Sequence, residues 1–285
     1  AFLQGNLVGD ASPTLATGTP TSVFWNQGAA TDPTVFDFSL SDATKLIVKI
    51  PGDYFIAATI PLTDASARAT IAAELYINGE VVPGTRSESS YMRNSNGHDE
   101  SSDHIAQLVP GLNAGDVIEL KLSKTTKATD PATINSASMY VELVDSSRTV
   151  FSALSDGPDD GDDNLNRDFD VEDPALLTWA SNRKDAGFTH TDGGEEITLG
   201  SGSYLVTANV PLSGAIARGG PGMLITLNGD QVPGGRAEQG YIRNADSHTA
   251  ASLHFSGVIE VSGNQRLRIE TWKKGNPGNI TLPEG

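Results

Sequence analysis

Histidines are the side chains in this sequence with the clearest capacity for chemistry, and four of the five form two pairs separated by 150 positions. His98 is matched by His248, and His104 is matched by His254. Two imidazoles six residues apart on one extended strand face the same side, where they could bind a metal or titrate near neutral pH. Zinc needs a third and a fourth ligand, and no carboxylate between these histidines recurs in both copies. Simple hydrogen-bonding histidines are therefore favoured over a metal site.

Arginine and tyrosine also recur at equivalent positions in the two copies. The repeated positions are Arg86, Tyr91, Arg93, Arg236, Tyr241 and Arg243. Because Glu88 and Glu238 lie close by in the sequence, these guanidinium groups could form ion pairs that fix strand geometry, within the chain or between subunits. Alternatively, Arg and Tyr could hold a glycan or an acidic ligand. The ion pair is favoured, because both copies would need it to fold.

The densest acidic stretch, residues 155–174, has nine Asp or Glu among 20 residues. Such a stretch cannot bury enough apolar surface to pack, so we expect an exposed linker. Five of its carboxylates could supply oxygen ligands to calcium, and Gly157 and Gly161 would let the loop curl around the ion. The candidate calcium ligands are Asp156, Asp159, Asp160, Asp162 and Asp163. Their spacing differs from that of an EF-hand loop, so a solvated hinge is the favoured alternative.

No set of residues for covalent or metal-dependent catalysis stands out in the sequence. The chain has no cysteine, no GxSxG nucleophile elbow, no phosphate-cradling glycine loop and no HExxH pair. Its formal net charge of -17 repels phosphate backbones and anionic membranes. No apolar run approaches the roughly 18 residues that a membrane-spanning helix needs. We therefore expect no enzyme, no required cofactor, no nucleic-acid partner and no membrane span.

One long stretch of the chain occurs twice, and it sets the organisation of the rest. Residues 51–110 match residues 201–260 at 21 of 60 positions, with an unbroken offset of 150. A repeat of this length indicates two copies of one domain. The predicted parts are an N-terminal strand at 1–10, a first jelly roll at 19–147, an acidic linker at 148–173 and a second jelly roll at 174–285.

Both copies consist of short alternating runs bounded by Gly, Pro, Asn and Asp. This pattern predicts an all-β fold of two tandem antiparallel jelly-roll sandwiches. Asn78-Gly79 and Asn228-Gly229 lie between apolar runs, and Asn-Gly favours a type I′ hairpin because both central residues need positive φ. Pro83-Gly84 and Pro233-Gly234 mark the next bend.

Several short motifs follow one another in a fixed order. Gly-x-Tyr opens a strand in GDYFIAATIPL and GSYLVTANVPL, an LxxNG turn follows, a Gly-Asp loop leads into AGDVIELKLSK, and SASMYVELV closes the first copy. This order resembles the jelly-roll heads of the complement-one-q and tumour-necrosis-factor superfamily. The resemblance implies ten-stranded jelly rolls, frequent trimers, extracellular placement and ligand binding or adhesion.

The two copies differ in their closing strand. In the first copy, alternation places Ala137, Met139, Val141 and Leu143 on one inward face. The sequence of the second copy stops at Gly285, where its matching strand should begin, so we expect that strand to be missing. A missing strand leaves unpaired backbone groups beside an open hydrophobic groove.

The N-terminal segment has the pattern of that missing strand. Ala1, Leu3, Gly5 and Leu7 fall at the positions of Ala137, Met139, Val141 and Leu143. One hypothesis is that this strand completes the second jelly roll of the next subunit, which builds a head-to-tail filament. A second is that the 285 residues are one period of a longer array, in which the strand continues from the domain before it. The alternative to both is a segment that folds back on its own chain or stays disordered.

These patterns favour a structural protein over a binding protein. We expect a subunit of an extracellular filament or fibre, assembled head to tail with copies of itself by strand complementation. The first alternative is a secreted or cell-surface adhesion module that recognises glycan or protein, and the second is a viral or phage fibre or capsid component. A start at Ala1 rather than Met is typical of a processed, exported chain, which favours an extracellular or cell-surface location.

Overall fold

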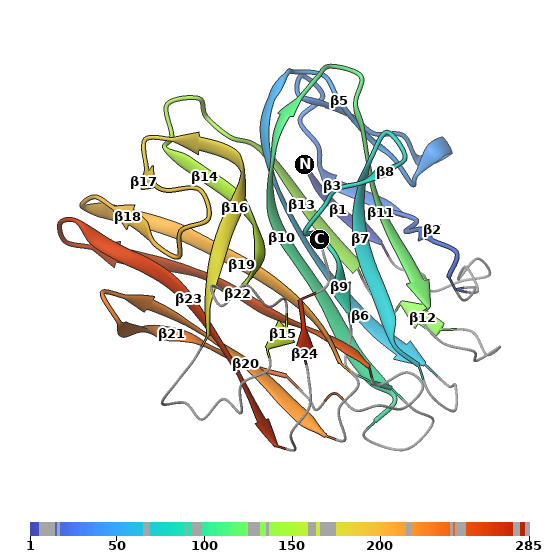
Figure 1. Ribbon diagram of the computed structural model, residues 1–285. Coiled ribbons are helices and arrows are strands. Elements are labelled where there is room, and N and C mark those ends of the chain that lie inside the picture. Colours follow the sequence, from blue (N-terminus) through green and yellow to red (C-terminus); the bar gives the residue numbers. More distant parts are fainter. Residues whose placement is uncertain are drawn as a thin grey trace. The chain divides into compact units, whose positions relative to one another are not determined.

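The fold is built almost entirely from β-strands (Figure 1). The computed structural model describes residues 1–5, 15, 18–64, 69–88, 91–92, 98–124, 132–134, 137–158, 164–165, 175–214, 218–239, 242, 249–275 and 280–282. Among these residues the only helical element is the short 3-10 helix η1 (Leu40–Asp42). The chain divides into two compact units, Ala1–Ser147 and Arg148–Gly285. The predicted all-β fold of two tandem antiparallel sandwiches is confirmed.

The first unit contains two antiparallel sheets. One has, in order, β10 (Glu100–Leu112), β6 (Gly52–Asp64), β13 (Ala137–Leu143), β1 (Phe2–Gly5) and β3 (Gln27–Ala30), with β12 (Ala132–Ile134) also paired to β6. The other has β4 (Phe36–Asp37), β5 (Leu46–Val48), β11 (Val117–Lys124), β7 (Ile71–Ile77) and β8 (Glu80–Val81), with β2 (Thr21–Ser22) paired to β11 and β9 (Ser87–Glu88) to β7.

Alternation along the strands fills the first core. On β6, the side chains of Tyr54, Ile56 and Ala58 are buried, and they meet Met139 and Val141 of β13, which have no exposed surface. Full burial of an aliphatic side chain of this size stabilises the fold by about 1.5–3 kcal/mol. The core of the first unit is therefore closed by β13.

The second unit repeats this plan with different strand partners. One sheet has, in order, β14 (Val150–Pro158), β16 (Ala175–Ala186), β23 (Gln265–Gly275), β18 (Ile197–Leu199) and β17 (Thr189–His190), with β20 (Gly219–Leu227) paired to β23 and β21 (Asp230–Glu238) to β20. The other has β15 (Asn164–Leu165), β24 (Ile280–Thr281), β19 (Gly202–Gly214) and β22 (Ala250–Val261). The buried residues Met223, Ile225 and Trp272 belong to its core.

The Asn-Gly turns fold as the sequence predicts. Asn78 and Asn228 both have a φ of 54°, and the glycines that follow them have φ values of 88° and 87°. Each Asn side chain also accepts a hydrogen bond from a neighbouring strand: the N–H of Val117 donates to Asn78 Oδ1, and the N–H of Arg266 donates to Asn228 Oδ1, both at 2.9 Å. These bonds fix the turns to the adjacent strand in both copies.

The boundary between the two units differs from the predicted linker at 148–173. Strand β14 begins at Val150 and pairs with β16 of the second unit, and β15 pairs with β24. The predicted linker was based on the acidic residues of 155–174. It also included the preceding run VFSAL at 150–154, whose apolar residues favour a strand. The part of the predicted linker that lies in β14 therefore belongs to the second sandwich.

The N-terminal strand corrects a second expectation, because it lies in its own first unit. Phe2 and Gly5 of β1 stand opposite Tyr140 and Ala137 of β13, and β3 covers the other side of β1. The reason is that β13 pairs with β6 on one side only, so its second edge needs a partner. Leu7 and the rest of residues 6–10 lie outside the described residues.

Across the described ranges, no helix has both the length and the apolar character needed to cross a membrane.

Candidate strand-accepting edge

Strands β6 and β19 are equivalent, with an offset of 150 at both ends, yet in the described part of the chain one side of β6 is paired over more residues than the same side of β19. Short strands pair with the ends of both: Thr63 and Asp64 pair with β12, and Ser213 and Gly214 pair with β24. β13 then covers β6 from Tyr54 to Thr59. Within the described part of the second unit, no strand pairs with the corresponding side of β19 over Tyr204–Ala208. We call this side the open edge.

Hydrogen-bond parity shows which backbone groups face the open edge. The N–H of Gly214 donates to the carbonyl of Thr249 at 2.7 Å, so the even-numbered residues of β19 exchange bonds with β22. The odd-numbered Leu205 and Thr207 therefore direct their N–H and C=O groups to the open edge. In the first unit, the N–H of Val144 donates to Asp53 at 2.8 Å, and the same parity bonds the equivalent residues of β6 to β13.

The side chains beside the open edge are less buried than their counterparts. Tyr54 and Ile56 have no exposed surface in the first unit, and Ala58 is 5% exposed. Tyr204, Val206 and Ala208 are all half-buried, although they pack against the second core. The second core is thus apolar and partly uncovered at the position where β13 seals the first.

The outer face of the same strand carries a second apolar feature. Leu205 stands opposite Val258 of β22, and these side chains are 57% and 67% exposed. Their equivalents in the first unit, Phe55 and Leu108, are half-buried. Two directly opposed apolar side chains beside unpaired backbone groups favour contact with a further apolar surface.

Aromatic side chains pack beside Tyr204 at one end of the open edge. The ring of Tyr204 lies 5.9 Å from that of Phe188, and Phe188 lies 6.0 Å from Phe151 of β14. The hydroxyl of Tyr204 donates to the carbonyl of Gly200 at 3.2 Å. These contacts hold Tyr204 at the start of the open edge.

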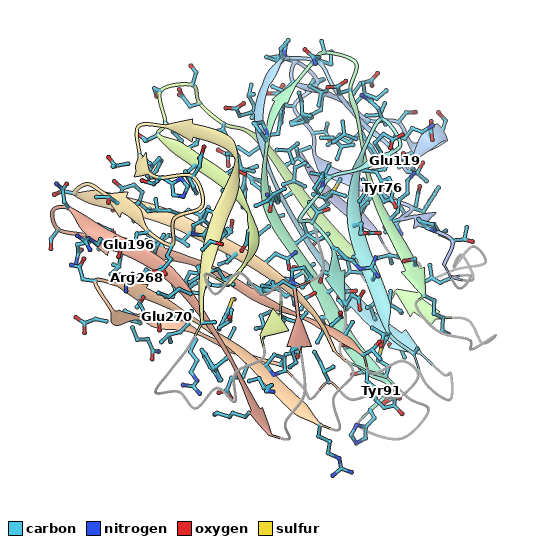
Figure 2. The ribbon with its side chains drawn as sticks, in the orientation of Figure 1. Tyr76, Tyr91, Glu119, Glu196, Arg268 and Glu270 are labelled. Carbon is cyan, nitrogen blue, oxygen red and sulfur yellow. The ribbon has the colours of Figure 1, made fainter. Side chains whose placement is uncertain are left out.

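Arg86 forms the ion pair that its sequence neighbours favour. Its Nε donates to Glu88 Oε1 at 2.7 Å, and its Nη1 donates to Glu74 Oε1 at 3.2 Å. Glu88 is only 8% exposed, so the guanidinium neutralises a carboxylate that would otherwise be buried alone. Tyr91, labelled in Figure 2, is half-buried. These contacts suit a structural role.

Arg236 forms the corresponding ion pair with a more exposed carboxylate, because the side chain of Glu238 is 48% exposed. Its Nε donates to Glu238 Oε1 at 3.1 Å, and its guanidinium carbon lies 4.8 Å from the centre of the Trp272 ring. Lys274 Nζ donates to the same carboxylate at 3.2 Å. Hydrogen bonds from Arg236 and Lys274 lower the pKa of Glu238. The other three residues of the repeated set, Arg93, Tyr241 and Arg243, lie outside the described residues.

A further ion pair of the second unit lies beside the ladder between β18 and β23. Arg268 and Glu196 point toward each other in Figure 2, and Arg268 Nε donates to Glu196 Oε1 at 2.9 Å. Hydrogen bonds from Arg268 lower the pKa of Glu196. Continuing the β5–β11 ladder by one residue places Lys45 and Glu119 at the matching position with their charges exchanged. In the first copy, Lys45 forms its ion pair with Asp42, and Glu119 forms its ion pair with Lys121.

The predicted metal ligands do not form a described site. Asp156 lies in β14, whereas Asp159, Asp160, Asp162 and Asp163 lie outside the described residues. His98 and His104 are exposed, and His254 is half-buried. His248 is also outside the described residues. Over the ranges that the structure describes, no three His, Asp or Glu side chains come together as a metal would require.

Asp103 is a buried carboxyl that the sequence reasoning did not single out. It is 1% exposed, and Ser87 Oγ donates to its Oδ1 at 3.0 Å, while its Oδ2 has no hydrogen-bond partner in the described part of the chain. Burial raises the pKa of Asp103 well above its usual value. The available signal was the apolar Leu253 at the matching position of the second copy, which marks an inward site.

Comparisons with known proteins found distant structural neighbours. No family model and no curated protein matches the chain. Murine APRIL at pH 8.5, of the tumour-necrosis-factor family, aligns at 16% identity over 50% of this chain and 98% of its own, with a TM-score of 0.34. The CBM22-1–CBM22-2 tandem domain of Paenibacillus barcinonensis Xyn10C aligns at 10% identity over 97% of this chain and 100% of its own, with a TM-score of 0.25. The strands and sheets described above define the chain as a tandem β-sandwich protein.

Proposed function

We propose that this chain is a structural subunit of an extracellular filament, in which the second sandwich of one copy accepts a β-strand from another copy. The observation that carries the proposal is the contrast between β6, closed by β13, and β19, open over Tyr204–Ala208. An exposed sheet edge above a partly uncovered core is a template for strand addition.

The occupant is a strand, because the equivalent position of the first sandwich is held by one. It is a strand of a second copy, because the first eight residues of this chain match the alternation of β13. A second copy offers the same strand to every open edge, so the contact repeats from subunit to subunit. Such a heterologous contact builds a filament unless rotation closes a ring.

The energetics favour a firm joint. An added strand bonds to the outward N–H and C=O groups of Leu205 and Thr207, and each bond contributes about 0.5–1.5 kcal/mol. It also covers the half-buried Val206 and Ala208, at about 25 cal/mol per Å² of apolar surface removed from water. Ordering of the strand offsets part of this gain.

The rival class, a module that binds glycan or protein, is what the resemblance implies, and the repeated Arg and Tyr positions are its candidate ligand contacts. In the described structure, carboxylates already engage Arg86 and Arg236. That arrangement supports the structural role over ligand recognition, so we do not propose a second function.

Replacing Thr207 by Pro tests the proposal in the full chain. The N–H of Thr207 faces the open edge, so Pro there removes a donor that an added strand needs and leaves the β22 ladder intact. We expect wild-type chains to form filaments in electron microscopy and large species in sedimentation, and Thr207→Pro chains to stay monomeric. Thr207→Ala keeps the N–H and should assemble like the wild type. Wild-type chains that remain monomeric at high concentration, or Thr207→Pro chains that form filaments, would overturn the proposal.

A further inference from the structure

We propose that Asn228, in the turn between β20 and β21, is a site of spontaneous deamidation, and that Asn78 in the equivalent turn of the first unit is shielded from the same reaction. Each asparagine precedes a glycine, and both Asn-Gly pairs are exposed. The reaction requires neither assembly nor the open edge, so it is independent of the proposed function.

Deamidation begins when the backbone nitrogen of the following glycine attacks Cγ of the asparagine. An N–Cγ bond forms, the Cγ–Nδ2 bond breaks, and ammonia leaves with the proton of the glycine nitrogen. Water then opens the cyclic imide, either to aspartate or to isoaspartate, whose backbone is one methylene longer. Water is thus the only co-reactant, and each event adds one negative charge to the chain.

Several features of the two turns are the same and cannot distinguish their reactivity. The asparagines have the same φ of 54°, and a Cβ placed on Gly79 or Gly229 would meet no atom within 4 Å. In the described part of the chain, neither glycine N–H donates a hydrogen bond. The residue after each glycine is acidic, Glu80 or Asp230. In both turns, therefore, the attacking nitrogen is accessible and the local sequence is similar.

In the first unit, both ends of the Asn78 amide are held. Nδ2 of Asn78 donates to Asp116 Oδ1 at 2.8 Å, and Oδ1 of Asn78 accepts from the N–H of Val117 at 2.9 Å. Hydrogen bonds from the backbone of Asn113 and from Asn78 lower the pKa of Asp116, so this carboxyl is ionised at neutral pH. The Asn78 side chain must leave this charged acceptor before its Cγ can meet the glycine nitrogen. The negative charge of Asp116 also disfavours removal of the glycine proton.

In the second unit, only the oxygen of the Asn228 amide is held. The N–H of Arg266 donates to Asn228 Oδ1 at 2.9 Å, whereas Nδ2 makes no hydrogen bond with the described residues. Gln265, the residue before Arg266, occupies the position of Asp116 and is neutral. Its Oε1 accepts from the N–H of Ser262 at 3.2 Å. The Asn228 side chain therefore rotates towards the following glycine after losing one hydrogen bond rather than two.

The second unit also accommodates the product better. After deamidation to aspartate, residue 228 keeps an oxygen for the N–H of Arg266, and the charge strengthens that bond. The same change at residue 78 replaces a donor by a carboxylate beside the ionised Asp116. Asn228→Asp should therefore leave the melting temperature unchanged, and Asn78→Asp should lower it by a few degrees.

Peptide mapping by mass spectrometry measures both reactions in one sample of the folded full chain, incubated at mildly alkaline pH. Asn228 should deamidate about tenfold faster than Asn78, because only Asn78 must break a hydrogen bond to a charged acceptor. The chain unfolded in denaturant is the matched control. There the two Asn-Gly sites should react at similar rates, since the contacts that distinguish them are lost.

Exchanging the residue that distinguishes the two turns tests the cause. Asp116→Gln gives the first unit the residue of the second and should raise the rate at Asn78 about tenfold, and Gln265→Asp should slow Asn228 by a similar factor. Both variants should fold, because each introduces a residue that the equivalent position already carries. If Asn228 does not react in the folded chain, reacts no faster than Asn78, or is unaffected by Gln265→Asp, the inference is wrong, whatever Thr207→Pro does to filaments.

Discussion

Strands β6 and β19 have similar sequences but different neighbours, so the sequence of a strand does not determine its surroundings. Both have 13 residues, both follow a Gly-x-Tyr start, and both pair along one side with an equivalent strand, β10 or β22. The inward residues of β6 are buried under β13, whereas no described strand pairs with that side of β19 over Tyr204–Ala208, and its inward residues there are half-exposed. The neighbouring strand, rather than the strand itself, decides whether the core is closed.

Truncating the central inward residue should have its largest effect in the closed sandwich. Ile56→Ala removes a side chain with no exposed surface and should lower the free energy of unfolding of the first unit by about 2–5 kcal/mol. Val206→Ala removes a half-exposed side chain, and its effect should be about 1 kcal/mol. Denaturant unfolding, with hydrogen exchange to assign each transition to a unit, measures both. Equal losses in monomeric protein would mean that β19 is covered after all.

The same proline substitution should affect the two strands differently. Ala57 faces Tyr140 of β13 by hydrogen-bond parity, so Ala57→Pro breaks an interior ladder bond and should destabilise the first unit by about 1–3 kcal/mol from that bond alone. Thr207→Pro should change the stability of monomers by much less, because its N–H faces the open edge. Thermal unfolding of both variants under dilute, monomeric conditions compares them. A large loss for Thr207→Pro would show that this N–H has a partner within its own chain.

Asp103 gives the first sandwich a pH dependence that the second lacks at the matching Leu253. Because burial raises the folded-state pKa of Asp103 above its unfolded value, the folded state holds a proton that the unfolded state has lost. The contribution of Asp103 to the free energy of unfolding is thus greatest below its unfolded-state pKa. It falls as the pH rises from the unfolded-state pKa to the folded-state pKa, by about 1.4 kcal/mol per pH unit. Asp103→Asn should remove this slope. A slope that survives the substitution would assign it to another group.

The smallest expected difference in stability is between variants of Arg86 and Arg236. Arg86→Ala leaves the nearly buried Glu88 without its cation and should destabilise the first unit by about 1–3 kcal/mol. Arg236→Ala removes an exposed ion pair and a contact with Trp272, and should cost about 1 kcal/mol or less. Replacing each arginine by Lys is the matched control, because it keeps the charge and loses the bidentate geometry. Equal losses for the two Ala variants would contradict the difference in burial.

Local chemistry could be predicted from the sequence at several particular positions. The Asn78 and Asn228 turns, the inward alternation of Met139 and Val141, and the ion pair of Arg86 depend on contacts close in sequence or on strand period, and the structure shows each of them. The burial of Asp103 was not predicted from the sequence, because aspartates are usually exposed. Its hydrogen bond with the buried Ser87 becomes visible only in the structure.

Pairing between distant segments was the part that local patterns could not assign. Residues 1–5 match the pattern of a strand in the β13 position, yet the same pattern also suits a strand beside β13, and the structure places them there. The run at Val150 was hidden by the acids that follow it, although it pairs with β16. The alternation of apolar and polar residues indicates which face of a strand is buried, but it does not identify the strand that pairs with it.

By itself, the sequence determined that this protein has two copies of an all-β domain, because a 150-residue offset and period-two alternation are encoded locally. Only the tertiary structure decided that β1 pairs within its own unit and that Leu205 and Thr207 direct backbone groups to an open edge. The physical reason is that hydrogen bonds between strands join residues far apart in the chain, so partner choice depends on which edges remain available after folding.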